Sequence, residues 1–286
     1  MNAAVTFALL SLAAAGCLDV SFKRFSRKSR SRGIYVAFCG VSWTMLQLVY
    51  FVSQDIAITF DGITLGYGIV AGLVLALANL LLIESLTHLH VSMGSTIYRL
   101  NTIGVIILSV LVLGEPLGML KVLGVMCGIF AVWVLYERPR GGDTVKGAVA
   151  FFWLAVAASA LRAIFGVVAK DGLSAGADAD AMLLLYAMAW IPCGLVYAWR
   201  REGQVRITAS KLAYGAVSGL LLCLTANFII AAMTTGDASV VVPIANLSFV
   251  VALLISTAMG MEALTLRKGG AIAVAGIAIF LLAQAA

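Results

Sequence analysis

The chain contains one sequence pattern twice. The stretch LGYGIVAGLVLAL, which begins at Leu65, returns as LAYGAVSGLLLCL at Leu212. A single ungapped offset of 147 residues serves nearly the whole length. Because an internal repeat of this kind means that one folding unit is used twice, we expect two copies, residues 1–140 and 141–286.

Long apolar runs make up most of both copies. The chain is 63% hydrophobic and only 11% charged, whereas a soluble domain carries about 25% charged residues. Runs near 20 residues match a helix across a hydrocarbon core about 30 Å thick. Continuous runs also exclude the alternating pattern of a membrane β-barrel. We therefore predict an all-α polytopic membrane protein with ten transmembrane helices. The spans are expected at about 3–21, 34–53, 63–86, 91–113, 116–136, 145–169, 181–199, 211–233, 239–259 and 268–285.

Five spans in each copy would thread the second copy through the membrane upside down. The loop FKRFSRKSRSRG after the first span has six Lys or Arg, while its repeat equivalent AKDGLSAGADAD has one Lys and three Asp. The next pair of loops shows the reverse. SQDIAITFDG after the second span has no Lys or Arg, whereas its equivalent WRREGQVRITAS has three. Because cytoplasmic loops carry the excess of Lys and Arg, this exchange predicts two inverted five-helix repeats.

The same charges predict an orientation. Summed over all loops, one face holds nearly all the basic residues, and the other has only Lys121 and Lys170. This places both termini on the outer side. Since these residues lie beside membrane spans, the net charge of +6 does not indicate a nucleic-acid partner. The basic face comprises Lys23, Arg24, Arg27, Lys28, Arg30, Arg32, Arg138, Arg140, Lys146, Arg200, Arg201, Arg206, Lys211, Arg267 and Lys268.

Several classes of chemistry lack their sequence signals. The five cysteines lie inside apolar runs without metal-like spacing. His88 and His90 form no HExxH motif, and no phosphate-binding P-loop is present. We therefore expect no enzyme activity, no catalytic residue, no metal and no cofactor.

The segment LSVLVLGEPLGMLKVLGVMCGIFAVWVL carries a family resemblance. It joins two predicted helices through Gly114, Glu115 and Pro116, and a lysine closes the first helix of each copy, at Lys23 and Lys170. In these features and in its ten spans the chain resembles the EamA family of the drug/metabolite transporter (DMT) superfamily. The resemblance implies a small-metabolite carrier, mostly an exporter, driven by a gradient or by substrate alone. Family members are usually drawn with cytoplasmic termini, opposite to the charge argument.

Residues shared by both copies are expected to serve the shared scaffold. Gly68 and Gly72 match Gly215 and Gly219, and such GxxxG faces let helices approach closely. We expect Glu115 at a structural turn. There Gly114 would cap one helix, Pro116 would lie in the first turn of the next, and the carboxylate would lie near a helix N-terminus.

Charges that differ between the copies are the stronger site candidates. Arg99 and Arg162 lie inside the fourth and sixth spans, and Asp19 and Glu84 lie in the first and third. A charge inside a span costs about 2.5–3.5 kcal/mol on insertion scales, so it should face protein or water. The arginines would suit a carboxylate-bearing substrate, and a desolvated Asp19 or Glu84 would suit proton coupling. The alternative is that these groups form static ion pairs, or that the two acids reach the membrane interface.

Polar stripes on the fourth and ninth spans complete the predicted pathway. Ser95, Arg99 and Thr102 recur at three- and four-residue steps on the fourth span, and Pro243 and Asn246 do so on the ninth. We expect these stripes to form the walls of the path.

Aromatic residues give a second candidate lining. Trp43, Gln47 and Tyr50 share a helical face in the second span, and Trp190 repeats the pattern in the seventh. The alternative for these aromatic residues is anchoring at the membrane interface. Asn79 in the third span is counted with the candidate pathway residues.

The leading hypothesis is a secondary transporter in the inner or plasma membrane that moves a small metabolite by alternating access. Export of an amino acid, an organic acid or a similar compound is favoured, because inverted repeats provide two near-equivalent shapes around a midplane site. Proton-coupled efflux of drugs or cations is the alternative, and a non-transporting receptor or channel subunit ranks lower. The expected partners are the substrate, the lipid bilayer and a coupling proton or sodium ion, with a homodimer as the candidate assembly.

Overall fold

The computed structural model describes residues 2–26, 32–85, 98, 101–134, 148–202, 207–261 and 264–285. The predicted site residues Ser95 and Arg99 lie outside the described residues, as does Glu262. Every regular element within these ranges is a helix. The predicted all-α class is therefore confirmed.

Apolar helices account for both copies. The first copy contains α1 (Ala3–Ser26), α2 (Arg32–Ser53), α3 (Gly62–Ser85), α5 (Asn101–Leu113) and α6 (Met119–Val134). The second contains α7 (Ala148–Ser174), α8 (Ala179–Tyr197) with the π-helical turn η1 (Ala198–Glu202), α9 (Ala209–Thr235), α10 (Ala238–Asn246), α11 (Phe249–Ala258) and α12 (Leu266–Gln284). Within the described ranges eight helical segments are long and apolar enough to cross a membrane, with α10 and α11 counted together. The helices α5 and α6 are shorter and equally apolar.

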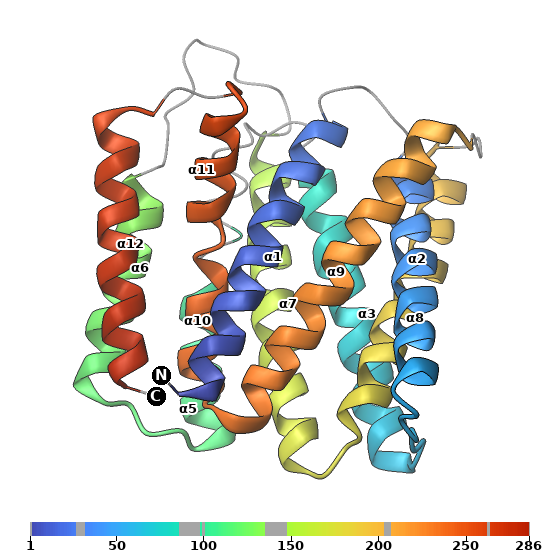
Figure 1. Cartoon of the computed structure of the whole chain (residues 1–286), viewed down its shortest axis with the longest axis horizontal. Helices are drawn as coiled ribbons and strands as arrows, with labels where there is room; N and C mark the ends of the chain where they lie inside the picture. Colours follow the sequence, from blue (N-terminus) through green and yellow to red (C-terminus); the bar gives the residue numbers. More distant parts are fainter. Residues whose placement is uncertain are drawn as a thin grey trace.

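The two copies run through the bundle in opposite directions (Figure 1). α1 rises from the lower end of the view and α6 also rises, whereas α7 and α12 descend. Both termini consequently lie at the lower end. The inverted arrangement that loop charges predicted is thus present in the fold.

Close helix approach at glycines follows the repeat. A Cβ added to Gly68 of α3 would come within 2.4 Å of Leu185 in α8. A Cβ added to Gly215 of α9 would come within 2.8 Å of Phe38 in α2. Both pairs are related by the 147-residue offset, so the α3–α8 and α9–α2 contacts are copies of each other. The glycines allow the backbones to pack closely, as expected for small residues in membrane helices.

The two repeat-related tryptophans pack on each other between α2 and α8. Trp43 of α2 and Trp190 of α8 meet edge to face, with ring centroids 6.2 Å apart and an interplanar angle of 74°. Both side chains are buried. The contact joins the two copies where their equivalent helices cross.

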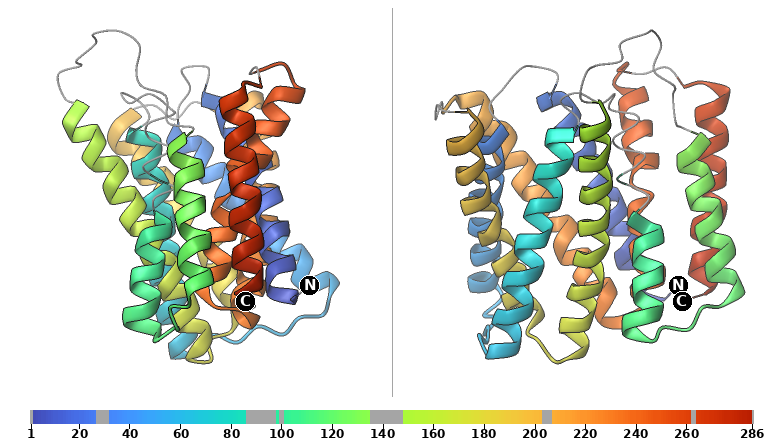
Figure 2. Two further views of the ribbon diagram at one scale, coloured as in Figure 1. Left: turned by 90° about the vertical axis from the view of Figure 1, so that its left-hand side faces the viewer. Right: turned by 180° about the vertical axis from the view of Figure 1, so that it is seen from behind.

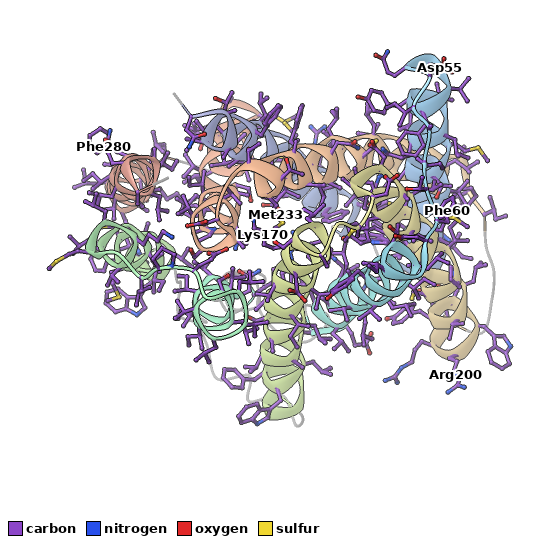
Figure 3. The ribbon with its side chains drawn as sticks, turned by 90° about the horizontal axis from the view of Figure 1, so that it is seen from below. Asp55, Phe60, Lys170, Arg200, Met233 and Phe280 are labelled. Carbon is purple, nitrogen blue, oxygen red and sulfur yellow. The ribbon has the colours of Figure 1, made fainter. Side chains whose placement is uncertain are left out.

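The helices α6 and α12 form a pair at one side of the molecule (Figure 2). Gly124 of α6 lies against Leu282 of α12, where an added Cβ would be 2.8 Å from Leu282 Cγ. Seen from below, the pair lies beside α5 and α10, and Phe280 projects outward from α12 (Figure 3).

Two helix boundaries differ from the prediction. The ninth span was expected to be one helix over 239–259, but it breaks into α10 and α11 at Leu247 and Ser248. Pro243 has no N–H to donate within α10, and the N–H groups of Leu247 and Ser248 bond to carbonyls three residues back. Pro116 also lies in a loop, since α6 begins at Met119. The expected first-turn position of Pro116 was therefore wrong.

Candidate transport site

The break in the ninth span carries a polar junction between the two copies. Asn246, the last residue of α10, donates through Nδ2 to Asn101 Oδ1 at 2.8 Å and to Thr102 Oγ1 at 3.0 Å. Asn101 and Thr102 are the first residues of α5 and both are buried. The predicted pair Thr102 and Asn246 is thus brought into direct contact, with Asn101 as an additional member.

The break between α10 and α11 lies within a candidate membrane span, and this limits what can surround it. Backbone groups freed by a break are tolerated inside a bilayer only where protein or a water-filled cavity surrounds them. Transporters use such broken helices near the midplane to bind substrates and ions. The break after Asn246 therefore marks the most favourable place for a site in the described part of the chain.

Asp19 meets the same break from the other side. Ser248 donates through Oγ to Asp19 Oδ2 at 3.2 Å. Gly16, one turn earlier on α1, allows this approach, because an added Cβ would lie 2.5 Å from Val251 and 2.8 Å from the Ser248 carbonyl oxygen. As expected, Asp19 lies near the end of the first span, which ends at Phe22, although α1 itself continues to Ser26.

Arg162 lies in the middle of α7, on the stripe that faces α5 and α10. A Cβ on Gly166, one turn below Arg162, would lie 3.5 Å from Val105 of α5 and 3.8 Å from Val242 of α10. One turn further up, α5 reaches Thr102 and α10 reaches Asn246. The register of the three helices therefore places the Cα of Arg162 at the level of the polar junction.

The charge of Arg162 is not matched by an acid within the described ranges. Its guanidinium lies 5.1 Å from the ring centroid of Phe165, and no ion pair with a described carboxylate is found. The predicted pairing of Arg162 with Asp19 or Glu84 is therefore not observed. An unmatched arginine in a membrane span is a functional candidate.

Glu84 instead belongs to the upper end of the bundle. It is the penultimate residue of α3, where its carboxylate accepts a short hydrogen bond from the Tyr197 hydroxyl. Arg201 Nη2 lies 3.9 Å from Glu84 Oε1. Glu84 thus lies near a span end, as expected, and apart from the break in the ninth span.

The remaining predicted lining residues have packing roles in this conformation. Gln47 is fully buried and exchanges hydrogen bonds of 2.8 and 3.2 Å with Asn227 of α9. Trp43 and Trp190 pack on each other. Tyr50 is 46% exposed, and Asn79 donates to the Leu75 carbonyl of its own helix. Their part in the pathway stays a prediction.

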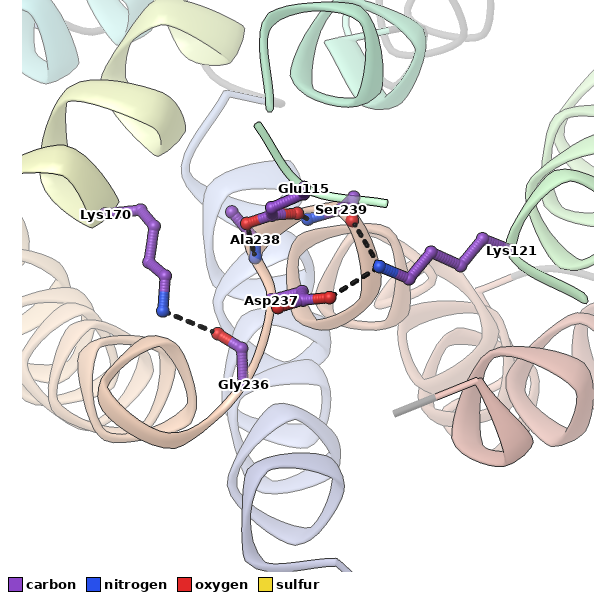
Figure 4. Close-up of polar contacts among 7 residues, drawn as sticks. All are labelled: Glu115, Lys121, Lys170, Gly236, Asp237, Ala238 and Ser239. Atoms are coloured by element: carbon purple, nitrogen blue, oxygen red, sulfur yellow. Dashed lines mark hydrogen bonds and ion pairs between the residues drawn. The ribbon is translucent and has the colours of Figure 1, made fainter. Parts of the chain in front are cut away.

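Charged groups surround the α9–α10 turn at the lower end of the bundle (Figure 4). Glu115 accepts hydrogen bonds from the backbone N–H groups of Ala238 at 2.7 Å and Ser239 at 2.9 Å. A carboxylate at a helix N-terminus is stabilised by the helix dipole. Glu115 was predicted to lie near a helix N-terminus, and it does. The helix, however, is α10 of the second copy and not the helix that follows Glu115 in the sequence.

Two lysines bind the same turn. Lys121 of α6 donates to Asp237 Oδ2 at 2.5 Å and to Ser239 Oγ at 3.2 Å. Lys170 of α7 donates to the carbonyl oxygens of Met233 at 2.7 Å and Gly236 at 3.0 Å, at the C-terminal end of α9. Figures 3 and 4 show Lys170 pointing towards this end of α9. We call Glu115, Lys121, Lys170 and Asp237 the lower clamp.

The inverted bundle of apolar helices defines a polytopic membrane protein. Residues 2–137 match the family model described as "EamA-like transporter family". Residues 2–137 thus carry the sequence of the EamA-like transporter family, which is part of the DMT superfamily, and the apolar helices of both copies make the chain a multi-pass membrane protein. No curated protein sequence matches the chain.

A solved structure described only as "Crystal structure of protein" has a similar fold. It aligns over 99% of this chain and 97% of its own, with a TM-score of 0.85 and 14% sequence identity. At that identity the likeness concerns the fold alone.

Proposed function

We propose that this transporter is a secondary carrier for a small carboxylate-bearing metabolite, such as an amino acid or an organic acid, with export favoured. It would act in the inner or plasma membrane. The observation that carries the proposal is the polar junction at the broken ninth span, where Asn101, Thr102 and Asn246 join the two copies. Such a midplane site between inverted repeats is how many secondary carriers bind their substrates.

Charge at the junction level supports a carboxylate. Arg162 stays ionised in any protein environment and presents a planar fork that matches a carboxylate. No described acid neutralises it. Asp19, held by Ser248 on the α1 side, would then receive either the ammonium group of an amino acid or a coupling proton.

The lower clamp supports alternating access. In this conformation Glu115 and Lys170 tie the α9–α10 turn to the α5–α6 loop and to α7. Opening the junction to the lower side requires these contacts to separate, while their formation closes that side. The carrier would therefore exchange the clamped shape for one in which the clamp is open.

Proton-coupled efflux of cations is the second candidate. It is favoured by the contact that Asp19 makes with Ser248 at the break in the ninth span. In this mechanism Asp19 would bind either a proton or the cationic substrate. Replacing Asp19 by Asn would then abolish cation transport, whereas a carboxylate carrier would keep at least substrate exchange.

Reconstituted proteoliposomes test the proposal. We would measure the uptake of radiolabelled amino acids, organic acids and cationic dyes by wild type, Arg162→Ala and Arg162→Lys, with the exposed Arg200→Ala as control. A bidentate arginine contact is worth several kcal/mol when desolvated, so Arg162→Ala should lose at least about tenfold of carboxylate transport. Arg162→Lys should retain part of it. Unchanged carboxylate transport by Arg162→Ala would contradict the proposal.

A further inference from the structure

The first turn of α10 holds a carboxylate that comes from the other copy. Oε1 of Glu115 accepts from the Ala238 N–H at 2.7 Å, and Oε2 accepts from the Ser239 N–H at 2.9 Å. Glu115 is buried in this position. A helix N-terminus attracts anions, because its first N–H groups lack partners within the helix and its dipole favours negative charge. The first turn of α10 is therefore a carboxylate-binding site that a side chain of the protein itself fills.

α10 is not capped by the residue that stands at its N-cap position. That residue is Asp237, and Asp is among the best N-cap residues, but its side chain makes no capping hydrogen bond. It pairs instead with Lys121 of α6, at 2.5 Å. In α8, by contrast, the N-cap residue Asp178 bonds the first N–H groups with its own carboxylate. The first N–H groups of α10 are consequently left to a carboxylate on a separate element.

Two ammonium groups flank the same turn (Figure 4). Lys121 pairs with Asp237, and Lys170 donates to the carbonyl oxygens at the end of α9. With Glu115 in place, the two lysines are balanced by two carboxylates. If Glu115 leaves, Asp237 balances only one of them. The excess positive charge then favours a second carboxylate as the replacement for Glu115, and disfavours a cation.

The loop that carries Glu115 is otherwise exposed. Residues 114–118 join α5 to α6, and Glu115 is buried while the other four are exposed. Gly114, which has a φ of +66°, and Gly118 both have nothing within 4 Å of an added Cβ. Withdrawal of the Glu115 side chain from α10 therefore disturbs little packing within its own loop.

We propose that Glu115 is an internal ligand of α10, and that the carboxylate of the transported metabolite displaces it when the lower end opens. The inference rests on the proposed function and adds a second carboxylate site, at the opposite end of α10 from the junction at Asn246. Substrate and Glu115 compete for the Ala238 and Ser239 N–H groups. The arriving carboxylate thereby releases the lower clamp.

Chemical rescue with acetate tests the inference. Glu115→Ala removes a methylene and a carboxylate, which together match acetate in size and charge. In chloride buffer the variant should unfold several degrees below wild type, because two N–H groups lose a charged acceptor. Replacing chloride by acetate at constant ionic strength should raise its unfolding temperature progressively, as a ligand of the folded state does. Wild type should not respond, because Glu115 fills its site.

Asp178→Ala is the matched control. It also removes a carboxylate that accepts from two N–H groups at a helix N-terminus. Asp178 is only half-buried, so water replaces it and acetate should leave the stability of this variant unchanged. Equal stabilisation of Asp178→Ala and Glu115→Ala would show a general anion effect and overturn the inference. A Glu115→Ala protein that folds but gains no stability from acetate would overturn it as well.

A cysteine reporter tests the displacement in a protein that keeps Glu115, and it decides the case if Glu115→Ala does not fold. In a Gly166→Cys protein without native cysteines, acetate on the lower side should speed labelling by an impermeant thiol reagent severalfold relative to chloride. Adding Glu115→Gln should lower the acetate concentration that is needed severalfold, since an amide oxygen is a weaker acceptor than a carboxylate. A labelling rate that acetate does not change would contradict the displacement.

Transport assays separate failure of this inference from failure of the proposed function. Both acetate experiments report binding and do not depend on transport. Carboxylate transport without rescue and without faster labelling would keep the proposed function and overturn the inference. Rescue without any carboxylate transport by wild-type proteoliposomes would instead reject the proposed function and, with it, the assignment of the α10 site to a substrate.

Discussion

Asn246 of the second copy donates a hydrogen bond of 2.8 Å to the side-chain oxygen of Asn101 in the first. The contact lies where the ninth span breaks, and it links the two copies. The offset places Arg99 opposite Asn246 and Ser248 opposite Asn101, so the residue types at this junction differ between the copies.

Loss of this junction should affect both stability and transport. Asn246→Ala leaves the buried Asn101 and Thr102 side chains without their donor, which should lower the free energy of unfolding by about 1–3 kcal/mol and reduce substrate uptake. Asn79→Ala is the control for stability, because Asn79 donates to the Leu75 carbonyl of its own helix and to no other group in the described part of the chain. Unfolding in mixed micelles measures both variants. An equal loss of stability in the two would contradict the importance of the junction.

Removal of Lys170 should loosen the lower end. In Lys170→Met the carbonyl oxygens of Met233 and Gly236 lose their donor, so the population opened at this end should increase. A cysteine at Gly166, one turn deeper, should then react at least severalfold faster with an impermeant thiol reagent applied to the lower side. Arg200→Met, at the exposed upper end, should leave the rate unchanged. No acceleration in Lys170→Met would show that the clamp does not close the path.

Substitution at the close helix contacts should destabilise the scaffold. A Cβ on Gly219 would lie 2.5 Å from Ser42 Cβ and 2.9 Å from the Cys39 carbonyl oxygen. Such overpacking costs about 1–3 kcal/mol, so Gly219→Ala should unfold at lower denaturant. Gly66→Ala on α3 meets nothing within 4 Å and should be neutral or stabilising by up to about 1 kcal/mol. Destabilisation by both substitutions would point to a helix-wide effect instead.

Asp178 should make stability depend on pH. It caps α8 and accepts hydrogen bonds from Asp180 and Ala181 at 3.0 Å and from Thr59 at 2.8 Å. Although burial opposes ionisation, the bonds from Ala181, Thr59 and Asp180 hold the pKa of Asp178 below its usual value of 3.8. A depressed carboxyl pKa stabilises the fold above the unfolded-state value, and the stabilisation is lost as pH falls through the folded-state pKa.

The measurement is thermal unfolding of wild type and Asp178→Asn between pH 7 and pH 3. Wild type should be the more stable at neutral pH, because the charged cap is lost in the variant. The difference should shrink as pH falls through the folded-state pKa of Asp178, which lies below 3.8. A difference that is constant across this range would contradict an ionised cap.

Much of the fold was predictable because membrane insertion constrains it directly. Span lengths follow from bilayer thickness, and the exchange of basic and acidic loops predicted the inverted threading. Both lysines of the lower end, Lys121 and Lys170, were recognised as exceptions to the basic face. The partners of Lys170 were not predicted, because this lysine binds backbone carbonyls, which leave no signal in side-chain identity.

The candidate site was only partly predictable. The polar stripes identified Thr102 and Asn246, and Pro243 signalled a weak point in the ninth span. Asn101 was missed although it adjoins Thr102, since helical periodicity assigned it to another face. The contact of Asp19 with Ser248 was not predicted, because the sequence does not show which helices α1 packs against.

The central claim is that the polar junction is reached alternately from the two sides of an inverted bundle. A single cysteine at Thr102, in a variant whose native cysteines are replaced, would be tested in oriented, sealed proteoliposomes with an impermeant thiol reagent. The account predicts labelling from either side and slower labelling in the presence of transported substrate. Labelling from one side only, with no change when substrate is added, would contradict it.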